Sequence, residues 1–570
     1  MLFFSLISSL LLASSTYASP TLNDVQYHEK ADHGAVASES ATCSKIGIEL
    51  LKRGGNAADA LVGTVFCVGV IGMYHSGIGG GGFMLVRSKT GKYEFIDFRE
   101  TAPAAAFQDM YNQNINLSIY GGLASGIPGE LRGLEHLHKN HGKLPWKTVM
   151  EPAIKVARCG FTVTKDTVRY MQSAISTGGN FLQTNPAWAI DFAPNGTLVG
   201  LGDTLTRRRY ADTLETISIH GADAFYTGAI ANATITALRA ANGTMTLDDL
   251  KNYTVAIRDP VSIKYKDYVL HACSAPSGGV VALAALNIFN GYQTSSPSQL
   301  NLTTHRLVES MKWAYGERTQ LGDPSFLPNI TAFEKNMLTD KTAKEIRAKI
   351  SNTATFTTSY YDPQGIQSLN DHGTSHVVTA DKDGMAITLT TTVNLLFGSH
   401  LIVPETGVIM NNEMNDFSVP GSSNAFGFIP SVANYIRPGK RPLSSISPTI
   451  AETADGKLYL AVGSAGGSRI ITATIQNVHH VLDQGYTPAQ ALASPRLHDQ
   501  LTPATIYFEW SGLNIQGYSN ATTAYLKSLG HNITFEAPGG STAQALRRLP
   551  NGTFEAAGEP RQYASGGFTY

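Results

Sequence analysis

One short segment carries residues that could act as a covalent catalyst. Asp371-His372-Gly373-Thr374-Ser375-His376 directly precedes the pattern of a β-hairpin, with apolar arms at 377–380 and 385–393. A threonine hydroxyl is a weak nucleophile unless a base lies beside it, and its own α-amine can be that base once the preceding peptide bond is cut. Gly373 suits such a cut, because glycine adds no bulk at the attacked carbonyl. Thr374 is therefore a candidate nucleophile, although threonine-rich strands without a catalytic role are common.

A glycine-rich loop offers a second candidate. Gly77-Ile78-Gly79-Gly80-Gly81-Gly82 leads into an expected strand at 83–86. A phosphate cradle is one interpretation, but no Gly-Lys-Ser/Thr follows the glycines. The sequence favours the other interpretation, in which glycine lets two backbone segments approach closely.

Other catalytic motifs do not fit. Gly463-Ser464-Ala465-Gly466 lacks the spacing of a nucleophile elbow, and the sequence contains no His-Glu-x-x-His. His479-His480 has no third ligand at the spacing of a metal site, which favours a structural pair on a helix. The sequence therefore predicts chemistry that needs no metal and no cofactor.

The elements that must position Thr374 begin with a helical hairpin. Residues 44–53 form an amphipathic helix, and Asn56 caps a second, largely apolar helix over 57–73. Cys43 and Cys67 flank this hairpin and could form a disulfide in an oxidising compartment. The two remaining cysteines lie on apolar segments and could equally be buried thiols, so the sequence leaves their state open: Cys159 and Cys273.

The rest of the chain runs from a helical part to a strand-rich part. Further helices are expected at 134–141, 146–158 and 304–315, and strands at 93–98 and 458–463. No internal repeat or low-complexity linker divides the chain, which predicts one large folded unit.

Composition narrows the class and the compartment. The chain has 570 residues, 42% of them hydrophobic, and a formal net charge of −1 without a basic patch, which argues against nucleic-acid binding. Residues 1–18 resemble a signal peptide cleaved after Ala18, with an uncleaved anchor as the alternative. We therefore expect a secreted or extracellular protein, or else a membrane-anchored or vacuolar one. Glycosylation sequons agree with that route and occur at Asn116, Asn195, Asn232, Asn242, Asn252, Asn301, Asn329, Asn520, Asn532 and Asn551.

Several rare motifs, in order from about His33 to Tyr570, resemble those of γ-glutamyltranspeptidases. They are Gly54-Gly55-Asn56-Ala57-Ala58-Asp59-Ala60, Asp97-Phe98-Arg99-Glu100-Thr101-Ala102-Pro103, Gly373-Thr374-Ser375-His376, Thr391-Thr392-Val393-Asn394, Asn411-Asn412-Glu413-Met414-Asn415-Asp416-Phe417-Ser418, Arg441-Pro442-Leu443-Ser444-Ser445-Ile446-Ser447-Pro448-Thr449 and Gly463-Ser464-Ala465-Gly466-Gly467-Ser468. The resemblance implies an α+β fold, the four-layer αββα sandwich of N-terminal nucleophile hydrolases. It also implies a precursor that cuts itself between Gly373 and Thr374 into a large subunit, 19–373, and a small subunit, 374–570, which remain together as a heterodimer.

The resemblance also assigns roles to the matched residues. Thr374 is the nucleophile, Thr392 supplies a hydroxyl beside it, and Gly466 and Gly467 form an oxyanion hole at a helix start. The remaining matches would bind the two charges of an amino acid. Its α-carboxylate would be bound by Arg99, Ser444 and Ser445, and its α-ammonium by Asn394, Glu413 and Asp416.

These roles imply a γ-glutamyltransferase and glutathione hydrolase. Glutathione, its S-conjugates or other γ-glutamyl compounds would donate the acyl group, and water, an amino acid or a dipeptide would accept it. The family resemblance also implies that residues 426–440 form a loop over the pocket, where water access could set the ratio of hydrolysis to transfer. Two alternatives are an acylase of the same fold that acts on another amide and a catalytically inactive binding protein. The charged set around Arg99 disfavours the first, and the presence of Thr374 disfavours the second.

Overall fold

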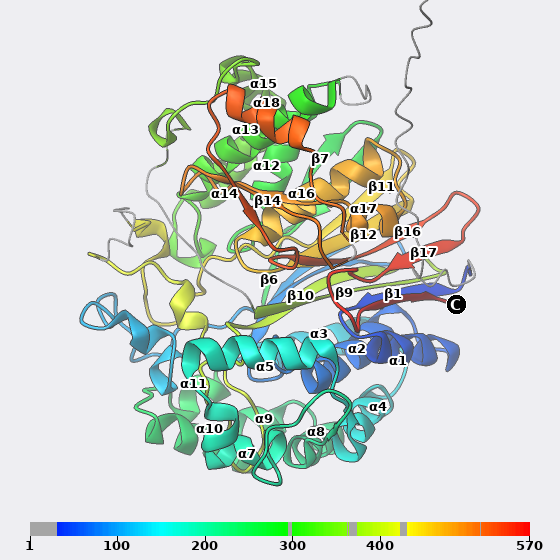
Figure 1. The fold of residues 1–570 in the computed structure, drawn as a ribbon. Coiled ribbons are helices and arrows are strands. Elements are labelled where there is room, and N and C mark those ends of the chain that lie inside the picture. Colours follow the sequence, from blue (N-terminus) through cyan, green and yellow to red (C-terminus); the bar gives the residue numbers. More distant parts are fainter. Residues whose placement is uncertain (1–30, 294–298, 362, 364–372, 422–429, 514) are drawn as a thin grey trace, which may run out of the picture.

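Two stacked β-sheets lie between two layers of helices (Figure 1). The computed structural model describes residues 31–293, 299–361, 363, 373–421, 430–513 and 515–570. The expected signal peptide at 1–18 and the pair Asp371-His372 lie outside these ranges. The four layers confirm the expected αββα architecture.

The first sheet has seven strands, all antiparallel, and contains the predicted hairpin. Its order is β18 (Gly566–Thr569), β1 (Gly34–Ser38), β9 (Gly373–Asp381), β10 (Ala386–Asn394), β2 (Gly81–Arg87), β3 (Tyr93–Asp97) and β6 (Ala256–Arg258). Every residue of β9 and β10 is buried, since both faces of the sheet are covered. The hairpin that begins at Gly373 therefore lies at the centre of the molecule.

The second sheet has six strands and packs on the first. Its order is β17 (Phe554–Ala557), β16 (Thr542–Arg548), β12 (Leu458–Ala465), β11 (Thr449–Thr453), β8 (Tyr268–Ala272) and β7 (Val261–Tyr265). The two sheets meet closely at β12, because a methyl group placed on Gly463 would lie 2.2 Å from the ring of His376 in β9. This contact fixes how the two sheets are aligned.

The helical hairpin covers the seven-stranded sheet from one side. It consists of α1 (Ala41–Lys52) and α2 (Ala57–Ile71), with Asn56 and Asp59 forming a capping box at the start of α2. A disulfide joins Cys43 to Cys67, as predicted. All of α2 is buried. None of the helices in the described ranges combines the length and apolar composition that a membrane crossing needs.

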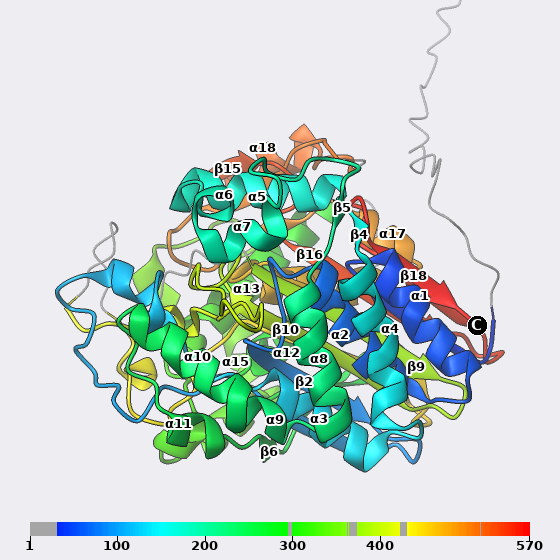
Figure 2. The ribbon, with the colours of Figure 1, turned by 90° about the horizontal axis from the view of Figure 1, so that it is seen from below.

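The remaining helices extend both helical layers. Figure 2, seen from below, shows the layer beneath the seven-stranded sheet. Along the chain the bounds are α3 (Glu130–His141), α4 (Trp146–Cys159), α5 (Lys165–Gly178), α6 (Phe181–Thr184), α7 (Pro186–Phe192), α8 (Arg208–His220), α9 (Asp223–Tyr226), α10 (Gly228–Ala240) and α11 (Leu247–Lys251). Beyond the six-stranded sheet lie α12 (Gly279–Phe289), α13 (Leu300–Arg318), α14 (Ile330–Met337), α15 (Asp340–Lys349), α16 (Arg469–Leu482), α17 (Pro488–Ala493) and α18 (Asn520–Ser528). Five short strands complete the fold: β4 (Phe161–Thr162), β5 (Thr204–Leu205), β13 (Leu497–His498), β14 (Ile506–Glu509) and β15 (Ile533–Glu536).

The unpaired cysteines differ from each other. Cys273 is a buried thiol, and burial raises its pKa. Cys159 is exposed, so it is not the buried thiol that the sequence left open. It is the last residue of α4 and lies off the buried stripe that Val149, Ala153 and Ala157 form.

Candidate active site

The Gly373–Thr374 bond lies at the first two positions of β9, and both residues are buried. The hydroxyl of Thr392 in β10 donates a hydrogen bond of 2.6 Å to the carbonyl oxygen of Gly373, while its oxygen accepts the N–H of Asn394 at 2.7 Å. In the uncut chain, therefore, Thr392 contacts the carbonyl that self-cleavage must attack. A bulge between Thr391 and Asn394 turns the strand here, and Asn394 has a positive φ of 74°.

The glycine-rich loop packs against the same strand end. A methyl group on Gly80 would lie 2.0 Å from the carbonyl oxygen of Thr392, and one on Gly79 equally close to that of Ile409. No side chain fits in either place. The interpretation of this loop as a close approach of backbone segments is confirmed, and the loop packs directly against the backbone of Thr392.

A buried carboxylate that the sequence motifs did not reveal lies next to the candidate nucleophile. Glu39 accepts a hydrogen bond from the hydroxyl of Ser375, and its other oxygen lies 2.7 Å from Nδ1 of His75 and 3.1 Å from the amide of Gln562. Glu39 therefore fixes the residue that follows Thr374. The one signal in the sequence was an acidic residue between the end of a buried strand and the Ser40 cap of α1.

His376 is excluded as the base of this site. It is fully buried, and burial lowers the pKa of its ring to about 3. Its two nitrogens lie 2.7 Å from the hydroxyl of Thr390 and 3.1 Å from that of Thr388. The ring is thus neutral and occupied with strand hydroxyls.

The turn after β12 follows the part of that strand that packs over β9. Along β12, the carbonyl of Val462 accepts from Thr388, which pairs with Val378, and Gly463 then lies over His376. The strand therefore runs towards the start of β9, and Gly466 and Gly467 follow at its end. Both glycines have positive φ, 116° and 57°, and lead into α16, whose first two N–H groups, those of Arg469 and Ile470, donate to the carbonyls of Gly466 and Gly467 at 3.2 and 3.0 Å.

The acidic residues and the arginine expected to bind opposite substrate charges contact each other. Arg99, 1% exposed, forms ion pairs with Glu413 and Asp416 of the 3₁₀ turn Glu413–Asp416. The positive charge of the Arg99 guanidinium is therefore already balanced by carboxylates of the protein itself. A bound amino acid would replace these internal ion pairs. Its carboxylate would pair with the guanidinium of Arg99, and its ammonium would pair with Glu413 and Asp416.

Glu100 adds a fourth ionisable group to this cluster. Burial raises the pKa of its carboxyl to about 8, although the neighbouring Arg99 acts to lower it. At neutral pH Glu100 therefore carries a proton. Among the described residues, the arginine then forms ion pairs with two carboxylates, those of Glu413 and Asp416.

The remaining predicted binding residues lie around the same cluster. Arg99 Nε donates to the carbonyl of Pro442 at 3.4 Å, which places Ser444 and Ser445 two and three residues away; both are buried. The side-chain amide of Asn394 donates to the carbonyl of Asn412, the residue before Glu413. The structure thus brings Arg99, which follows β3, and Asn394 of β10 together with the 411–416 and 441–445 segments.

The predicted pocket loop is described from residue 430 onward, and its first part, 426–429, lies outside the described residues. Lys440 Nζ donates to the carbonyls of Ala433 and Tyr435, at 2.7 and 2.8 Å. The backbone of Gly439 and Lys440 pairs with Ala102, three residues after Arg99. This part of the loop therefore lies beside the charged cluster.

One group of side chains could in principle hold a metal ion. Within the described ranges, His305, Glu309 and His531 present ligand atoms within 4.8 Å of one another. However, the ammonium of Lys312 lies 3.6 Å from Glu309 and 3.4 Å from the His531 ring. A second cation there would be repelled, so these residues fit a hydrogen-bond network better than a metal site.

The His479-His480 pair is structural, as predicted. Both lie on α16, and each bonds to the residue four positions on, His479 to Asp483 at 2.5 Å and His480 to Gln484 at 2.8 Å.

Comparison with known families gives a match along almost the whole chain. Residues 43–568 match the family model described as gamma-glutamyltranspeptidase. A protein of Arthroderma benhamiae named glutathione hydrolase proenzyme is 55% identical over 94% of this chain and 92% of its own length. A glutathione hydrolase of Aspergillus flavus is 49% identical over 94% of this chain and 89% of its own.

Solved structures agree on the fold. A cephalosporin acylase from Bacillus halodurans superposes with a TM-score of 0.84 at 25% identity, covering 98% of this chain and 99% of that one. The gamma-glutamyltranspeptidase of Helicobacter pylori has a TM-score of 0.53 at 29% identity and covers 56% of this chain and 92% of its own.

Proposed function

The chain belongs to the γ-glutamyltranspeptidase family, and we propose that it acts as a γ-glutamyltransferase and glutathione hydrolase with Thr374 as its nucleophile. The observation that carries this assignment is the Gly373–Thr374 bond at a buried strand start, with the Thr392 hydroxyl on its carbonyl. An activity that depends on a freed threonine amine needs such a bond.

Self-cleavage follows from this geometry. The hydroxyl of Thr374 attacks the Gly373 carbonyl, whose oxygen is polarised by Thr392 at 2.6 Å. The peptide C–N bond breaks, the acyl group moves to the threonine oxygen, and the nitrogen becomes a free amine. Water then hydrolyses the ester, which leaves Gly373 with a carboxylate and Thr374 as the first residue of the small subunit.

Turnover repeats the same chemistry on a substrate. Thr374 attacks the γ-carbonyl of the donor with its own amine as base, and the developing oxyanion is stabilised by the N–H groups at Gly466 and Gly467. The amine product leaves with a proton. Water or an amino acid or dipeptide amine then resolves the γ-glutamyl ester.

Donor selectivity comes from the charged cluster. Arg99 would bind the α-carboxylate with Ser444 and Ser445, and the α-ammonium would go to Asn394, Glu413 and Asp416. Two buried charges of opposite sign reject donors that lack either group. We therefore propose glutathione, its S-conjugates and other γ-glutamyl compounds as donors.

The compartment is proposed to be extracellular, with a membrane-anchored or vacuolar enzyme as the alternative. The Cys43–Cys67 disulfide supports passage through an oxidising compartment. All of the sequon asparagines except the half-buried Asn301 are exposed. Glycosidase treatment of the purified protein should increase its mobility on a denaturing gel, and sequencing of the large subunit should show whether it begins after Ala18.

The first test is the identity of the small subunit. A denaturing gel of the purified protein should show two bands, and the smaller should begin at Thr374. A Thr374→Ala protein should remain uncut and inactive towards a γ-glutamyl anilide. An intact active chain, or a smaller band that begins elsewhere, contradicts the mechanism.

A second test separates this function from that of an acylase of the same fold. Glutaryl anilide is γ-glutamyl anilide without the α-ammonium group. We expect kcat/KM for the γ-glutamyl compound to be higher by about 10⁴-fold, as for sites whose buried polar groups are left unpaired by an analogue. Equal rates, or a preference for glutaryl anilide, would favour the acylase.

A further inference from the structure

The turn assigned to the oxyanion rests directly on a second turn, between β15 and β16. A methyl group built on Gly466 would lie 2.4 Å from the carbonyl oxygen of Gly540 and 2.8 Å from the Cα of Ser541. Backbone therefore touches backbone with no side chain between them. Any displacement of Gly540 or Ser541 moves the peptide units of Gly466 and Gly467.

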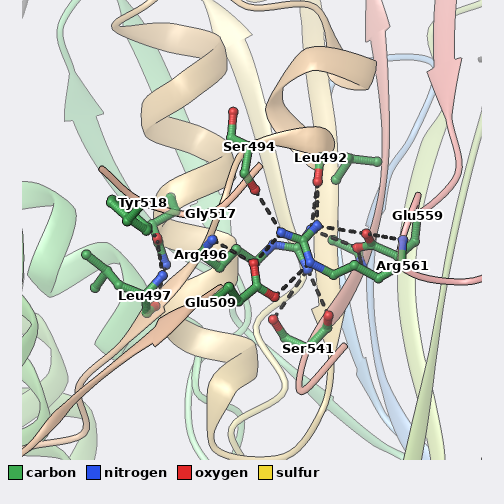
Figure 3. Close-up of polar contacts among 12 residues, drawn as sticks. Leu492, Ser494, Arg496, Leu497, Glu509, Gly517, Tyr518, Ser541, Glu559 and Arg561 are labelled. Carbon is green, nitrogen blue, oxygen red and sulfur yellow. Dashed lines mark hydrogen bonds and ion pairs between the residues drawn. The ribbon is translucent and has the colours of Figure 1, made fainter. Parts of the chain in front are cut away.

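A buried ion pair fixes Ser541 from the interior of the small subunit. Arg496, 4% exposed, donates from Nη1 to the backbone carbonyl of Ser541 at 2.9 Å and to its hydroxyl at 3.3 Å. Its Nη2 donates to Glu559 at 2.7 Å, and the same carboxylate oxygen accepts the N–H of Ala543 in β16. One guanidinium thus ties the turn to the strand that follows it (Figure 3).

The charges around this ion pair are balanced. Figure 3 shows the guanidinium groups of Arg496 and Arg561 between the carboxylates of Glu509 and Glu559. Arg561 donates to Glu509 at 2.5 and 2.8 Å and to Glu559 at 2.9 Å. Two cations face two anions, and further bonds run to backbone carbonyls of Leu492 and Ser494. Both guanidinium groups are thus held by several partners each, although the buried Nε of Arg496 has no hydrogen-bond partner among the described residues.

A second ion pair fixes the same turn from the other side. Arg469 is the first residue of α16, and its Nε lies 3.0 Å from the place a methyl group on Gly540 would occupy. It pairs with Glu536, the last residue of β15, at 3.1 and 2.5 Å. The helix that follows Gly467 is therefore joined to the strand that leads into the second turn.

We propose that Arg496–Glu559 and Arg469–Glu536 are positioning pairs that hold the Gly466–Gly467 N–H groups where the oxyanion develops. This inference rests on the proposed function, because it takes that turn as the oxyanion site. Oxyanion donors act through preorganised geometry, and a displacement of about 1 Å can lower a rate about 100-fold. The arginines act through the turns and not on the substrate.

Self-cleavage provides an internal reference. In the uncut chain the scissile carbonyl of Gly373 accepts a hydrogen bond from Thr392 on β10. This strand is not part of either turn that the two arginines hold. A variant with a displaced oxyanion turn should therefore still cut itself. Loss of turnover with normal self-cleavage is a result that general misfolding does not give.

The experiment compares three purified variants with the wild type. Arg496→Lys keeps the charge but cannot reach Ser541 and Glu559 together. Glu536→Gln weakens the second pair at a site that is 23% exposed, where substitution is better tolerated. The control is Arg547→Lys, which alters the Arg547–Glu555 pair at the opposite end of β16. Self-cleavage is followed on gels, and kcat and KM are measured with a γ-glutamyl anilide.

We expect Arg496→Lys to cut itself at the wild-type rate, with kcat lower by about 100-fold and KM within about twofold. Glu536→Gln should lose about 10-fold in kcat and Arg547→Lys less than twofold. Unchanged kcat in both test variants, an equal loss in the control, or a change in KM alone overturns the inference. If Arg496→Lys does not fold, Glu536→Gln decides. An inactive wild type would instead refute the proposed function.

Discussion

At the scale of single residues, Thr392 serves the precursor before it can serve the enzyme. The resemblance implies that its hydroxyl bonds the nucleophile, whereas in the uncut chain it bonds the carbonyl of Gly373. In the proposed mechanism that carbonyl becomes a tetrahedral oxyanion when Thr374 attacks, and we propose that the same hydroxyl stabilises it. The N–H of Asn394 fixes the oxygen from the other side.

Thr392→Val should slow self-cleavage by about 10²- to 10³-fold, because it removes one donor to the oxyanion without changing the shape of the side chain. The rate is measured from the fraction of intact chain on gels after synthesis. Thr392→Ser keeps the hydroxyl and should retain most of the rate. Equal rates for the valine and serine variants would show that the hydroxyl does not act on this bond.

Glu100 predicts a dependence of stability on pH. The pKa of its carboxyl is raised from about 4.5 to about 8 in the folded protein, so the folded protein keeps a proton that the unfolded chain releases at a lower pH. The favourable contribution is full below pH 4.5 and is lost as pH rises towards 8, with a slope of up to about 1.4 kcal/mol per pH unit.

Glu100→Gln should remove that slope. Urea unfolding is measured between pH 4.5 and 8 in the uncut Thr374→Ala background, where a single chain refolds. The free energy of unfolding should fall less steeply with pH in the Gln variant than in its parent. Parallel curves would mean that Glu100 is ionised throughout this range.

At the scale of elements, the glycine loop limits how β10 can be substituted or moved. Gly80→Ala would place a methyl group 2.0 Å from the Thr392 carbonyl. We expect a loss of about 1 to 3 kcal/mol in the free energy of unfolding, and slower self-cleavage, because the loop would push on the strand that carries Thr392.

Gly200→Ala is the matched control for this prediction. At Gly200 a methyl group would meet only Asp203 Oδ2, at 3.7 Å. Its stability should stay within about 0.5 kcal/mol of the wild type. Thermal melting and gel-based cleavage rates check both variants, and similar losses in the two would disprove the close-packing argument.

The elements also show what the sequence could predict. The spacing of apolar residues and the capping residues were sufficient to predict the helical hairpin and the β9–β10 hairpin, because both depend on residues close together in the chain. The predicted start of α1 was three residues too late. The contacts of Glu39 and the two ion pairs that hold the turn at Ser541 were not predicted. Their partners lie far apart in the chain: Glu39 meets Ser375 across 336 residues, and no local pattern encodes such a contact.

The charged cluster shows the same limit at the site itself. The motifs indicated Arg99, Glu413 and Asp416 individually, but Arg99 was assigned to the α-carboxylate of the substrate and the two acids to its α-ammonium. That the three pair with one another is a property of their packing. Sequence patterns specify residue types, whereas a competing partner is seen only in three dimensions.

At the scale of the whole molecule, the two segments on either side of Thr374 are interleaved. In the seven-stranded sheet, β9 and β10 of the expected small subunit lie between β1 and β2 of the large one. In the six-stranded sheet, β11 of the small subunit pairs with β8 of the large one. Cutting one peptide bond leaves all of these backbone pairs intact.

The cut enzyme should therefore behave as one particle. On gel filtration without denaturant it should elute with the uncut Thr374→Ala protein, whose chain mass is close to 61.0 kDa. With increasing urea, the subunits should separate only where activity and secondary structure are lost. Separation into two folded subunits before that point would contradict the interleaved arrangement.

The pairing of β1 with β18 has a further consequence. Ala35 pairs with Thr569, and the N–H of Gly34 donates to the carbonyl of Tyr570 at 3.0 Å, so the two ends of the described fold meet at one edge of the sheet. A short linker could join them in a circularly permuted gene that starts at Thr374. Once its initiator methionine is removed, such a chain would be synthesised with the nucleophile already at its N-terminus. The enzyme would then be active without self-cleavage and would have no zymogen stage.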